Sequence, residues 1–163
     1  MLLKKATIND YDVINHIAVI TWHATYGNIL TAQQMDYMLG LMYSRSAIQE
    51  QMEEQGHCFL LLEDNGVVLG FAAYQVDYKP GIAKLHKLYV LPEAHGKGAG
   101  KALVAEVESA VRSAGVSNLM LNVNRFNPAY NFYLKSGFVN LGEVNVDIGH
   151  GFFMEDYEMQ KSL

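Results

Sequence analysis

The segment from Leu88 to Leu103 constrains the fold more than any other part of this sequence. It combines a strand, a turn with three alternating glycines and the start of a helix, and it reads Leu-Tyr-Val-Leu-Pro-Glu-Ala-His-Gly-Lys-Gly-Ala-Gly-Lys-Ala-Leu. Glycine lets a backbone approach a ligand closely, and the free N–H groups of a helix N-terminus carry partial positive charge. A strand, a glycine-rich turn and a helix in this order are therefore suited to holding a phosphate group.

Two familiar phosphate-binding motifs do not fit this turn. A dinucleotide-binding fingerprint needs a third glycine where Lys101 stands. A nucleotide-binding P-loop needs glycine in place of His95 and serine or threonine in place of Ala102. The glycines could also make only a tight strand-to-helix turn, but three of them at alternate positions, flanked by Lys97 and Lys101, favour a ligand.

The periodicity of apolar residues predicts a single α/β domain over residues 1–163, on a mixed sheet, in the order β-α-α-β-β-β-α-β-α-β-β. Strands are expected at residues 2–8, 57–64, 67–78, 82–91, 116–124, 138–147 and 151–159. Helices are expected from Asn9 or Asp10 to Gly27, from a Thr31 and Gln34 capping pair onward, from a Ser46 and Gln49 capping pair to Gly56, from the glycine turn to Gly115, and at residues 128–136.

Three of these strands carry additional information. Asn65 and Gly66 separate the strands at residues 57–64 and 67–78, and this pair is typical of a type I′ hairpin turn. Successive side chains of a strand point to opposite faces of the sheet. In the strand at residues 82–91 we therefore expect one face to carry Lys84, His86, Leu88 and Val90, and the other to carry Leu85, Lys87 and Tyr89.

Composition excludes several classes of protein. A formal net charge of -5, from 12 basic and 17 acidic residues, argues against binding to nucleic acid through a basic surface. No apolar run reaches the roughly 18–20 residues of a membrane span, and Lys4 and Lys5 interrupt the apolar start, so we expect a cytoplasmic protein without a signal peptide. The single cysteine, Cys58, is expected in the core, and no metal site is expected because no His, Asp or Glu cluster has ligand spacing.

A second segment, downstream of the glycine turn, adds specificity to the first. It reads Asn-Pro-Ala-Tyr-Asn-Phe-Tyr-Leu-Lys-Ser-Gly-Phe from Asn127 to Phe138. Together the two segments resemble the acetyl-CoA motif and the downstream Asn, Ala, Phe-Tyr and Gly-Phe positions of the GNAT N-acetyltransferase superfamily. Gly98 and Gly100 stand at the glycine positions of that family, whereas His95 replaces its usual glutamine or arginine.

The resemblance implies a fold, a cofactor and a set of binding residues. The fold is a GNAT-type mixed, mostly antiparallel sheet of six to seven strands, flanked by about four helices. The cofactor is acetyl-CoA, whose pantetheine arm lies between two splayed strands, here residues 88–90 and 119–123, while backbone N–H groups of the turn hold its pyrophosphate. The residues implied in coenzyme binding are Leu88, Tyr89, Val90, His95, Gly96, Lys97, Gly98, Ala99, Gly100, Lys101, Asn127 and Lys135, with Asn124 as a rival of Asn127.

The resemblance also places Tyr133 near the coenzyme sulfur, as the general acid that gives a proton to the departing thiolate; its other interpretation is a core aromatic residue.

The sequence does not decide between candidates for the general base. His86 has a suitable unperturbed pKa of about 6.5 but could equally be a histidine bonded to a neighbour on the sheet, and Glu143 is a second candidate. A strand N–H near Leu88 or Tyr89 is the expected oxyanion donor.

The acceptor is expected to bind between the N-terminal helices and the last strands. Trp22, His23 and Tyr26 could line its cleft, and four acids could attract a cationic amine: Glu143, Asp147, Glu155 and Asp156. The ordinary alternatives are helix packing for the aromatic residues and a solvated edge for the acids. Residues 21–27 and 151–157 resemble polyamine acetyltransferases within the superfamily.

The predicted function is transfer of an acetyl group from acetyl-CoA to the primary amine of a small cationic molecule such as a polyamine, directly within a ternary complex. The alternatives are an acetyltransferase for protein N-termini, a non-catalytic acetyl-CoA-binding regulatory domain, and a nucleotide-binding P-loop protein. Phe152, Phe153 and Tyr157 are candidates for the surface of a homodimer.

Overall fold

The computed structural model describes residues 1–163 and contains one seven-stranded sheet of order β1-β2-β3-β4-β5-β7-β6. The strands are β1 (Leu2–Lys5), β2 (Cys58–Asp64), β3 (Val67–Lys79), β4 (Ile82–Val90), β5 (Asn118–Asn124), β6 (Val139–Gly149) and β7 (Phe152–Ser162). The helices are α1 (Tyr11–Tyr26), α2 (Ala32–Tyr43), α3 (Arg45–Glu53), α4 (Ala99–Ser113) and α5 (Ala129–Lys135). All neighbouring strands are antiparallel except β4 and β5, so the expected mixed sheet is confirmed.

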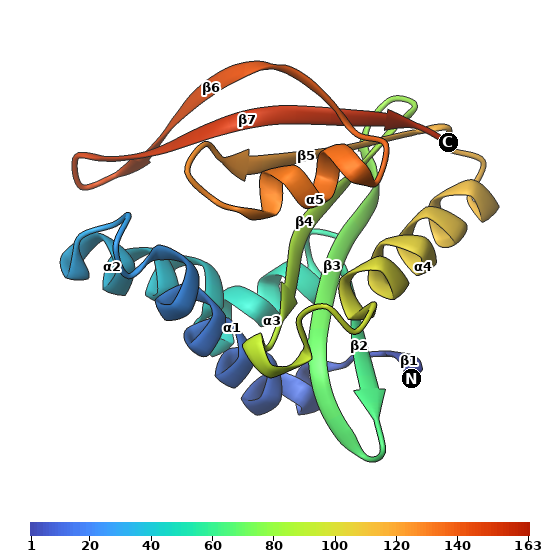
Figure 1. Ribbon diagram of the computed structural model, residues 1–163, viewed down its shortest axis with the longest axis horizontal. Helices are drawn as coiled ribbons and strands as arrows, with labels where there is room; N and C mark the ends of the chain where they lie inside the picture. The colour runs from blue at the N-terminus through green and yellow to red at the C-terminus, as the bar shows by residue number, and fades with distance from the viewer.

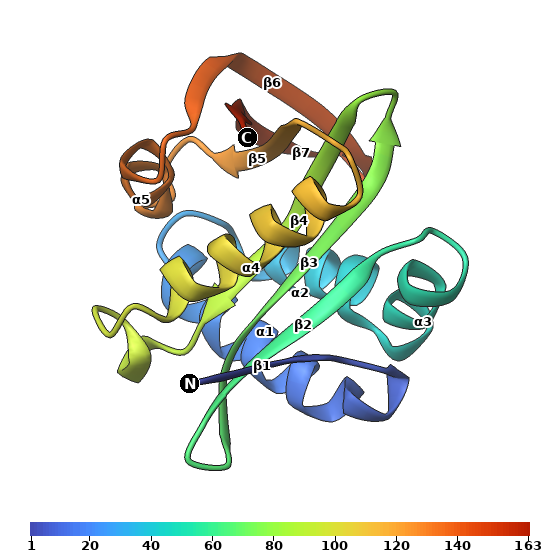
Figure 2. The ribbon, with the colours of Figure 1, turned by 90° about the vertical axis from the view of Figure 1, so that its right-hand side faces the viewer.

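Helices cover both faces of this sheet (Figures 1 and 2). One core lies between the sheet and α4 and α5, and includes Leu103, Val107 and Tyr133. The other lies between the sheet and the helices α1, α2 and α3, and includes Ile17 and Trp22. Because each strand of the centre contributes alternate side chains to the two cores, apolar burial on both sides holds the three layers together.

The helix starts differ from the sequence prediction at two points. Thr7, rather than Asn9 or Asp10, caps the first helical turn, and it forms a reciprocal capping box with Asp10. Ser44, rather than Ser46, caps α3, because its backbone is extended and its hydroxyl accepts a hydrogen bond from the Ala47 N–H. The Thr31 cap of α2 and the Asn65-Gly66 hairpin turn are confirmed, the latter by positive φ angles at both residues.

The two central strands, β4 and β5, part soon after they meet. They are paired only at Ala83 with Leu119 and at Lys84 with Met120. Beyond this point β4 remains paired with β3, whereas β5 remains paired with β7, and Figure 1 shows the two strands diverging. The sheet thus consists of two halves joined at one end and separated by a V-shaped gap at the other.

A β-bulge at His86 overturns the expected alternation of side chains in β4. The register with β3 shifts between Ala73 and Tyr74, so that Tyr74 is opposite Leu85 while Ala73 is opposite Lys87. One extra residue in a strand moves the side chains that follow it to the other face. Leu85 consequently shares the α4 face with Leu88 and Val90, while Lys87 and Tyr89 face the N-terminal helices, and the prediction that His86 shares a face with Leu88 is wrong.

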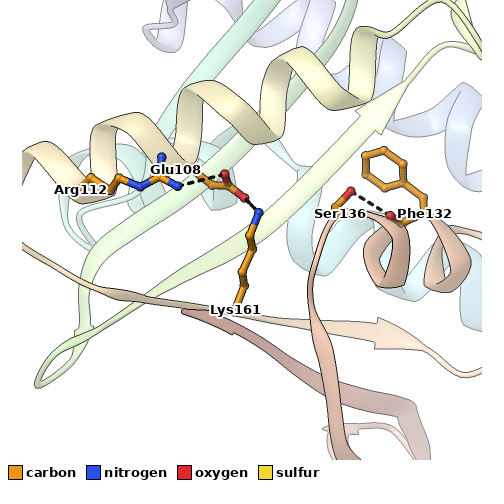
Figure 3. A network of polar contacts seen from close by, with 5 residues as sticks. All are labelled: Glu108, Arg112, Phe132, Ser136 and Lys161. Carbon is orange, nitrogen blue, oxygen red and sulfur yellow. Dashed lines mark hydrogen bonds and ion pairs between the residues drawn. The ribbon is translucent and has the colours of Figure 1, made fainter. Parts of the chain in front are cut away.

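An ion pair connects α4 to the far half of the sheet (Figure 3). Lys161 Nζ on β7 lies 2.6 Å from Glu108 Oε1, and Arg112 Nη2 lies 3.7 Å from Glu108 Oε2. In the same view Ser136 Oγ donates to the Phe132 carbonyl oxygen at 2.8 Å and closes the end of α5. Since α4 packs on β3 and β4, the Glu108–Lys161 pair links the two halves of the sheet near their joined end, where Lys161 is opposite Leu119 and Leu119 is opposite Ala83.

The candidate dimer residues are distributed unequally between surface and interior. Phe153 is 51% exposed, but Phe152 packs against Tyr37, and Tyr157 packs against Tyr130. Only Phe153 of the three therefore offers a large apolar surface.

None of the helices combines the length and the apolar character required to cross a membrane.

The Glu108–Lys161 pair should matter more for stability than an exposed pair does. We expect Glu108→Gln to lower the free energy of unfolding by about 1–3 kcal/mol, because the Lys161 ammonium loses a partner in a half-buried site. Glu63→Gln is the matched control, since Glu63 pairs with Lys4 near the surface, at 3.4 Å; its effect should stay within about 1 kcal/mol. Urea unfolding measures both, and equal effects would contradict the structural role.

Candidate active site

The glycine turn presents a row of unpaired backbone donors. None of the N–H groups from Gly96 to Lys101 has an acceptor within the chain, and the first helical hydrogen bond of α4 runs from Ala102 N to the Gly98 carbonyl. Gly96 and Gly98 have φ angles of 76° and 83°, a left-handed conformation that glycine adopts without strain. Open space surrounds both Cα atoms. A pyrophosphate placed at this helix N-terminus would meet several of these donors at once.

The charged side chains near the turn are available to a ligand. Lys97, Lys101 and Lys135 are all exposed, and none forms an ion pair. His95, which stands at a position expected for glutamine or arginine, folds back so that its Nε2 donates to the Val90 carbonyl oxygen at 2.9 Å. His95 therefore occupies the same strand end that the resemblance assigns to the coenzyme.

Backbone groups of β4 line the gap between β4 and β5. Leu91 N donates to the Leu69 carbonyl oxygen of the β3 side, so by alternation the backbone of Tyr89 also faces β3. The N–H and C=O groups of Leu88 and Val90 then face the gap, where β5 no longer pairs with them. This leaves Leu88, rather than Tyr89, as the strand position whose N–H is free to serve as an oxyanion donor.

Tyr133 lies on α5 and belongs to the core between the sheet and α4. Its side chain is 7% exposed and packs edge-on against Phe132 and Phe138. Burial, followed by the nearby Tyr89, raises the pKa of Tyr133 above the ordinary tyrosine value. The hydroxyl therefore stays protonated at neutral pH, as a proton donor requires.

Aromatic side chains from α1, α2 and β4 form a wall on the other face of the sheet, in the core beneath the N-terminal helices. The ring centroid of Trp22 lies 4.6 Å from that of Tyr26, 6.0 Å from that of Tyr43 and 6.5 Å from that of Tyr89. The indole N–H of Trp22 is buried without a hydrogen-bond partner. A buried donor of this kind is uncommon outside ligand sites, so this aromatic wall of Trp22, Tyr26, Tyr43 and Tyr89 is a candidate binding surface.

Asp156 on β7 is the one carboxylate that reaches this wall. It is 1% exposed, its Oδ1 has no hydrogen-bond partner, and its charge raises the pKa values of Tyr26 and Tyr89. Burial raises the pKa of Asp156 itself to about 6, against the weaker opposing effects of Lys84 and Arg125. Of the four acids expected to attract an amine, only this one is enclosed with the aromatic residues.

Asn127 joins α5 to α1 rather than standing free. Its Nδ2 donates to the Tyr26 hydroxyl at 2.9 Å, and its Oδ1 accepts from the Ala129 N–H at the start of α5. The rival residue Asn124 has its Oδ1 committed to the Phe126 N–H. The Asn127–Tyr26 bond therefore fixes the aromatic wall against the element that carries Tyr133.

The two candidate bases lie apart from this cluster. His86 stacks on His57 with ring centroids 4.0 Å apart, its Nε2 is bonded to Gln75 Oε1, and burial, His57 and nearby lysines lower its pKa to about 2. Glu143 on the edge strand β6 has 65% of its side chain exposed and pairs with Arg125 Nη1 at 3.6 Å. His23, Asp147 and Glu155 are likewise exposed.

Lys87 is a buried charge that the sequence pattern did not mark. Its Nζ lies 5.4 Å from the ring centroid of Tyr43 and 5.7 Å from that of Phe59, with no carboxylate partner. Burial, followed by Lys84, lowers the pKa of Lys87 to about 7. Strand alternation already separates Lys87 from Leu88, but only the packing of the N-terminal helices on this face shows that the lysine is buried.

Comparison with known proteins identifies the family to which this chain belongs. The family model of the acetyltransferase (GNAT) family matches residues 21–138. The chain belongs to the GNAT acetyltransferase family. Spermidine N(1)-acetyltransferase of Thermoplasma acidophilum is 27% identical over 158 residues, 94% of each chain. The uncharacterized N-acetyltransferase YuaI of Bacillus subtilis is 26% identical over 90% of this chain and 84% of that protein.

A solved structure shares the fold of this GNAT acetyltransferase. The PaiA N-acetyltransferase of Thermoplasma acidophilum, crystallised with coenzyme A, aligns with a TM-score of 0.82 over 99% of this chain and 98% of that chain, at 24% identity. GNAT enzymes use acetyl-CoA, and the free donors of the glycine turn together with the unpaired β4 edge fit that cofactor.

No three His, Cys, Asp or Glu side chains lie close enough together to hold a metal ion.

Burial of Asp156 should cost the enzyme stability in a pH-dependent way. A carboxyl group whose pKa is raised from 3.8 to about 6 on folding favours the folded state while protonated, and this contribution is lost as pH rises from about 4 through 6. Asp156→Asn removes the charge. We expect the variant to be more stable than the wild type by about 2–3 kcal/mol at pH 7.5, with the difference vanishing near pH 4.

Urea unfolding at several pH values measures this difference. Glu155→Gln is the matched control, because Glu155 is the exposed neighbour of Asp156 on the same strand. Its stability relative to the wild type should change little with pH. An Asp156→Asn variant that is less stable than the wild type at pH 7.5 would show that the carboxylate has a stabilising partner.

Proposed function

We propose that residues 1–163 form a single N-acetyltransferase domain that moves the acetyl group of acetyl-CoA to a primary amine of a small cationic molecule, such as a polyamine. One observation carries the proposal: the partnerless carboxylate of Asp156 is enclosed with the aromatic wall beside the gap between β4 and β5. A buried carboxylate and aromatic faces are the groups that bind an ammonium ion. The relative that acts as a spermidine N(1)-acetyltransferase supports the same class of acceptor.

The coenzyme would bind along the glycine turn and β4. When bound, acetyl-CoA supplies the acetyl group as an activated thioester. The N–H groups from Gly96 to Lys101 would bind the pyrophosphate, with Lys97 and Lys101 adding charge. The backbone groups of Leu88 and Val90 would bind the pantetheine arm, and the Val90 carbonyl would exchange its bond to His95 for one to the coenzyme.

Two groups of the chain would then act on the reacting atoms and two aromatic residues would hold the acceptor, directly within a ternary complex. The Leu88 N–H would donate to the carbonyl oxygen of the acetyl group and stabilise the charge that develops there. Tyr133 would protonate the departing sulfur, since its hydroxyl remains protonated. Trp22 and Tyr26 would hold the amine by their ring faces. Glu143 would contribute only long-range attraction, because it is exposed and paired with Arg125.

Thiol release from acetyl-CoA with a panel of amines tests the proposal. We expect turnover with spermidine, spermine and putrescine, and little with neutral amino acids, aminoglycosides or peptides with free N-termini, because aromatic rings beside one buried carboxylate suit an ammonium group on an apolar chain. Coenzyme binding is measured separately by thermal shift. Turnover only with peptides would favour a protein N-terminal acetyltransferase, and stabilisation by acetyl-CoA without any acetylated product would point to a regulatory domain.

Tyr133→Phe tests the general acid. We expect turnover to fall by about 10²-fold or more while the affinity for acetyl-CoA stays nearly constant, because only the proton donor is removed. Tyr130→Phe is the matched control on the same helix, since the Tyr130 hydroxyl accepts from Asn140 Nδ2 at 3.2 Å, near the surface. Steady-state kinetics with spermidine measure both, and an unchanged turnover number in Tyr133→Phe would remove Tyr133 from the mechanism.

A further inference from the structure

Acetyl transfer to an amine needs a group that removes a proton from the acceptor, because an ammonium nitrogen has no lone pair for attack. Both candidates from the sequence are unsuitable. His86 is bonded to Gln75 and stacked on His57, on the strand segment before the gap opens fully, and Glu143 points to solvent beside Arg125. The aromatic cluster, in contrast, encloses one unused proton acceptor.

The side chain of Asp156 faces the N-terminal helices. Met154, two residues before it on β7, packs into the core beneath α1 and α2, whereas the adjacent Tyr157 packs against α5 on the other face. Asp156 therefore lies on the face of β7 that carries Met154, beside Tyr26 and Tyr89. Tyr26 in turn is close enough to Tyr133 for the two hydroxyls to affect each other.

We propose that Asp156 receives the acceptor ammonium and takes its proton before the nitrogen attacks the acetyl group. This inference rests on the proposed function. Its basis is the position of an enclosed carboxylate, with one oxygen unpaired, among aromatic rings that include Tyr26, which is also a neighbour of Tyr133. An arriving ammonium supplies the missing hydrogen-bond donor and the missing opposite charge.

The surroundings of Asp156 set its proton affinity. The titratable and charged groups that affect it or are affected by it are Tyr26 on α1, Tyr89 and Lys84 on β4, and Arg125 after β5. Arg125 reaches the backbone rather than the carboxylate, because its Nε donates to the Asp156 carbonyl oxygen at 3.4 Å while its guanidinium also contacts Glu143 and Asn145. Burial dominates, so the pKa of Asp156 is raised to about 6.

The protons balance with Asp156 and Tyr133 acting together. The acceptor ammonium carries three protons on nitrogen, and the amide product carries one. Asp156 takes the first proton, and the freed lone pair forms the carbon–nitrogen bond as the carbon–sulfur bond breaks. Tyr133 gives its proton to the departing sulfur and recovers the second proton from nitrogen. Asp156 then returns its proton to solvent, so each turnover releases one proton.

The pH dependence of spermidine acetylation tests the role of Asp156. In the wild type, kcat/KM should fall below about pH 6 as Asp156 becomes protonated. Asp156→Asn should lower kcat by about 10²-fold near neutral pH. Its pH profile should lose the break near pH 6, and the rate should instead rise steadily, about tenfold per pH unit, as free amine becomes more abundant in solution. The KM for acetyl-CoA should not change.

Two further variants separate proton transfer from simple attraction and from damage to the fold. Asp156→Glu keeps a carboxylate and should retain the acid limb at reduced turnover. Glu155→Gln removes an exposed neighbouring acid and should match the wild type. If Asp156→Asn raises only the KM for spermidine and keeps both kcat and the acid limb, or if Asp156→Glu behaves like Asp156→Asn, the proposed proton transfer is wrong.

A failure of the proposed function gives a different result. If the wild type acetylates no amine of the panel, the acceptor assignment is wrong, and calorimetric titration of spermidine into the protein saturated with coenzyme A decides the role of Asp156 in ammonium binding. Binding to the wild type that weakens by at least about tenfold in Asp156→Asn supports the ammonium site. Equal affinities, or no binding to the wild type, overturn it.

Discussion

The divergence of β4 from β5 is the constraint on which the rest of the structure depends. Two parallel strands that pair at only two positions leave backbone donors and acceptors unused, and unused buried groups are costly. The protein limits this cost by pairing each strand fully on its other side and by connecting α4 to β7 through Glu108 and Lys161. The open edge therefore stays in place, and a coenzyme with its own amide groups can complete the missing hydrogen bonds.

The coenzyme half of the site could be predicted from sequence because its structure is local. Positive φ angles at Gly96 and Gly98, a helix that starts one residue later, and free N–H groups all follow from residues adjacent in the chain. The Asn65-Gly66 turn was predictable for the same reason. The caps were less certain, since Thr7 and Ser44 compete with polar neighbours that have almost equal capping ability.

The acceptor half could not be derived in the same way because it depends on distant contacts. A β-bulge has no firm sequence signature, yet the one at His86 decides that Leu85 shares the face of Leu88 and that His86 does not. The sequence offered four acids as candidates and singled out Glu143 among them, not Asp156. Only the pairing of β7 with β5 and β6, together with the position of α1, encloses Asp156 and leaves Glu143 and Glu155 at the surface.

The enclosed carboxylate also changes what the net charge of -5 implies. At the glycine turn the polyanionic coenzyme would meet local donors and lysines, so the acidic surplus need not act against it. For the acceptor, a diffuse acidic surface distinguishes cations weakly because solvent screens it. A desolvated carboxylate without a partner distinguishes them strongly, because its charge is unfavourable until an ammonium arrives and a neutral molecule of equal size leaves it unpaired. In the proposed mechanism, selection for a cation and removal of its proton would then follow from one buried group.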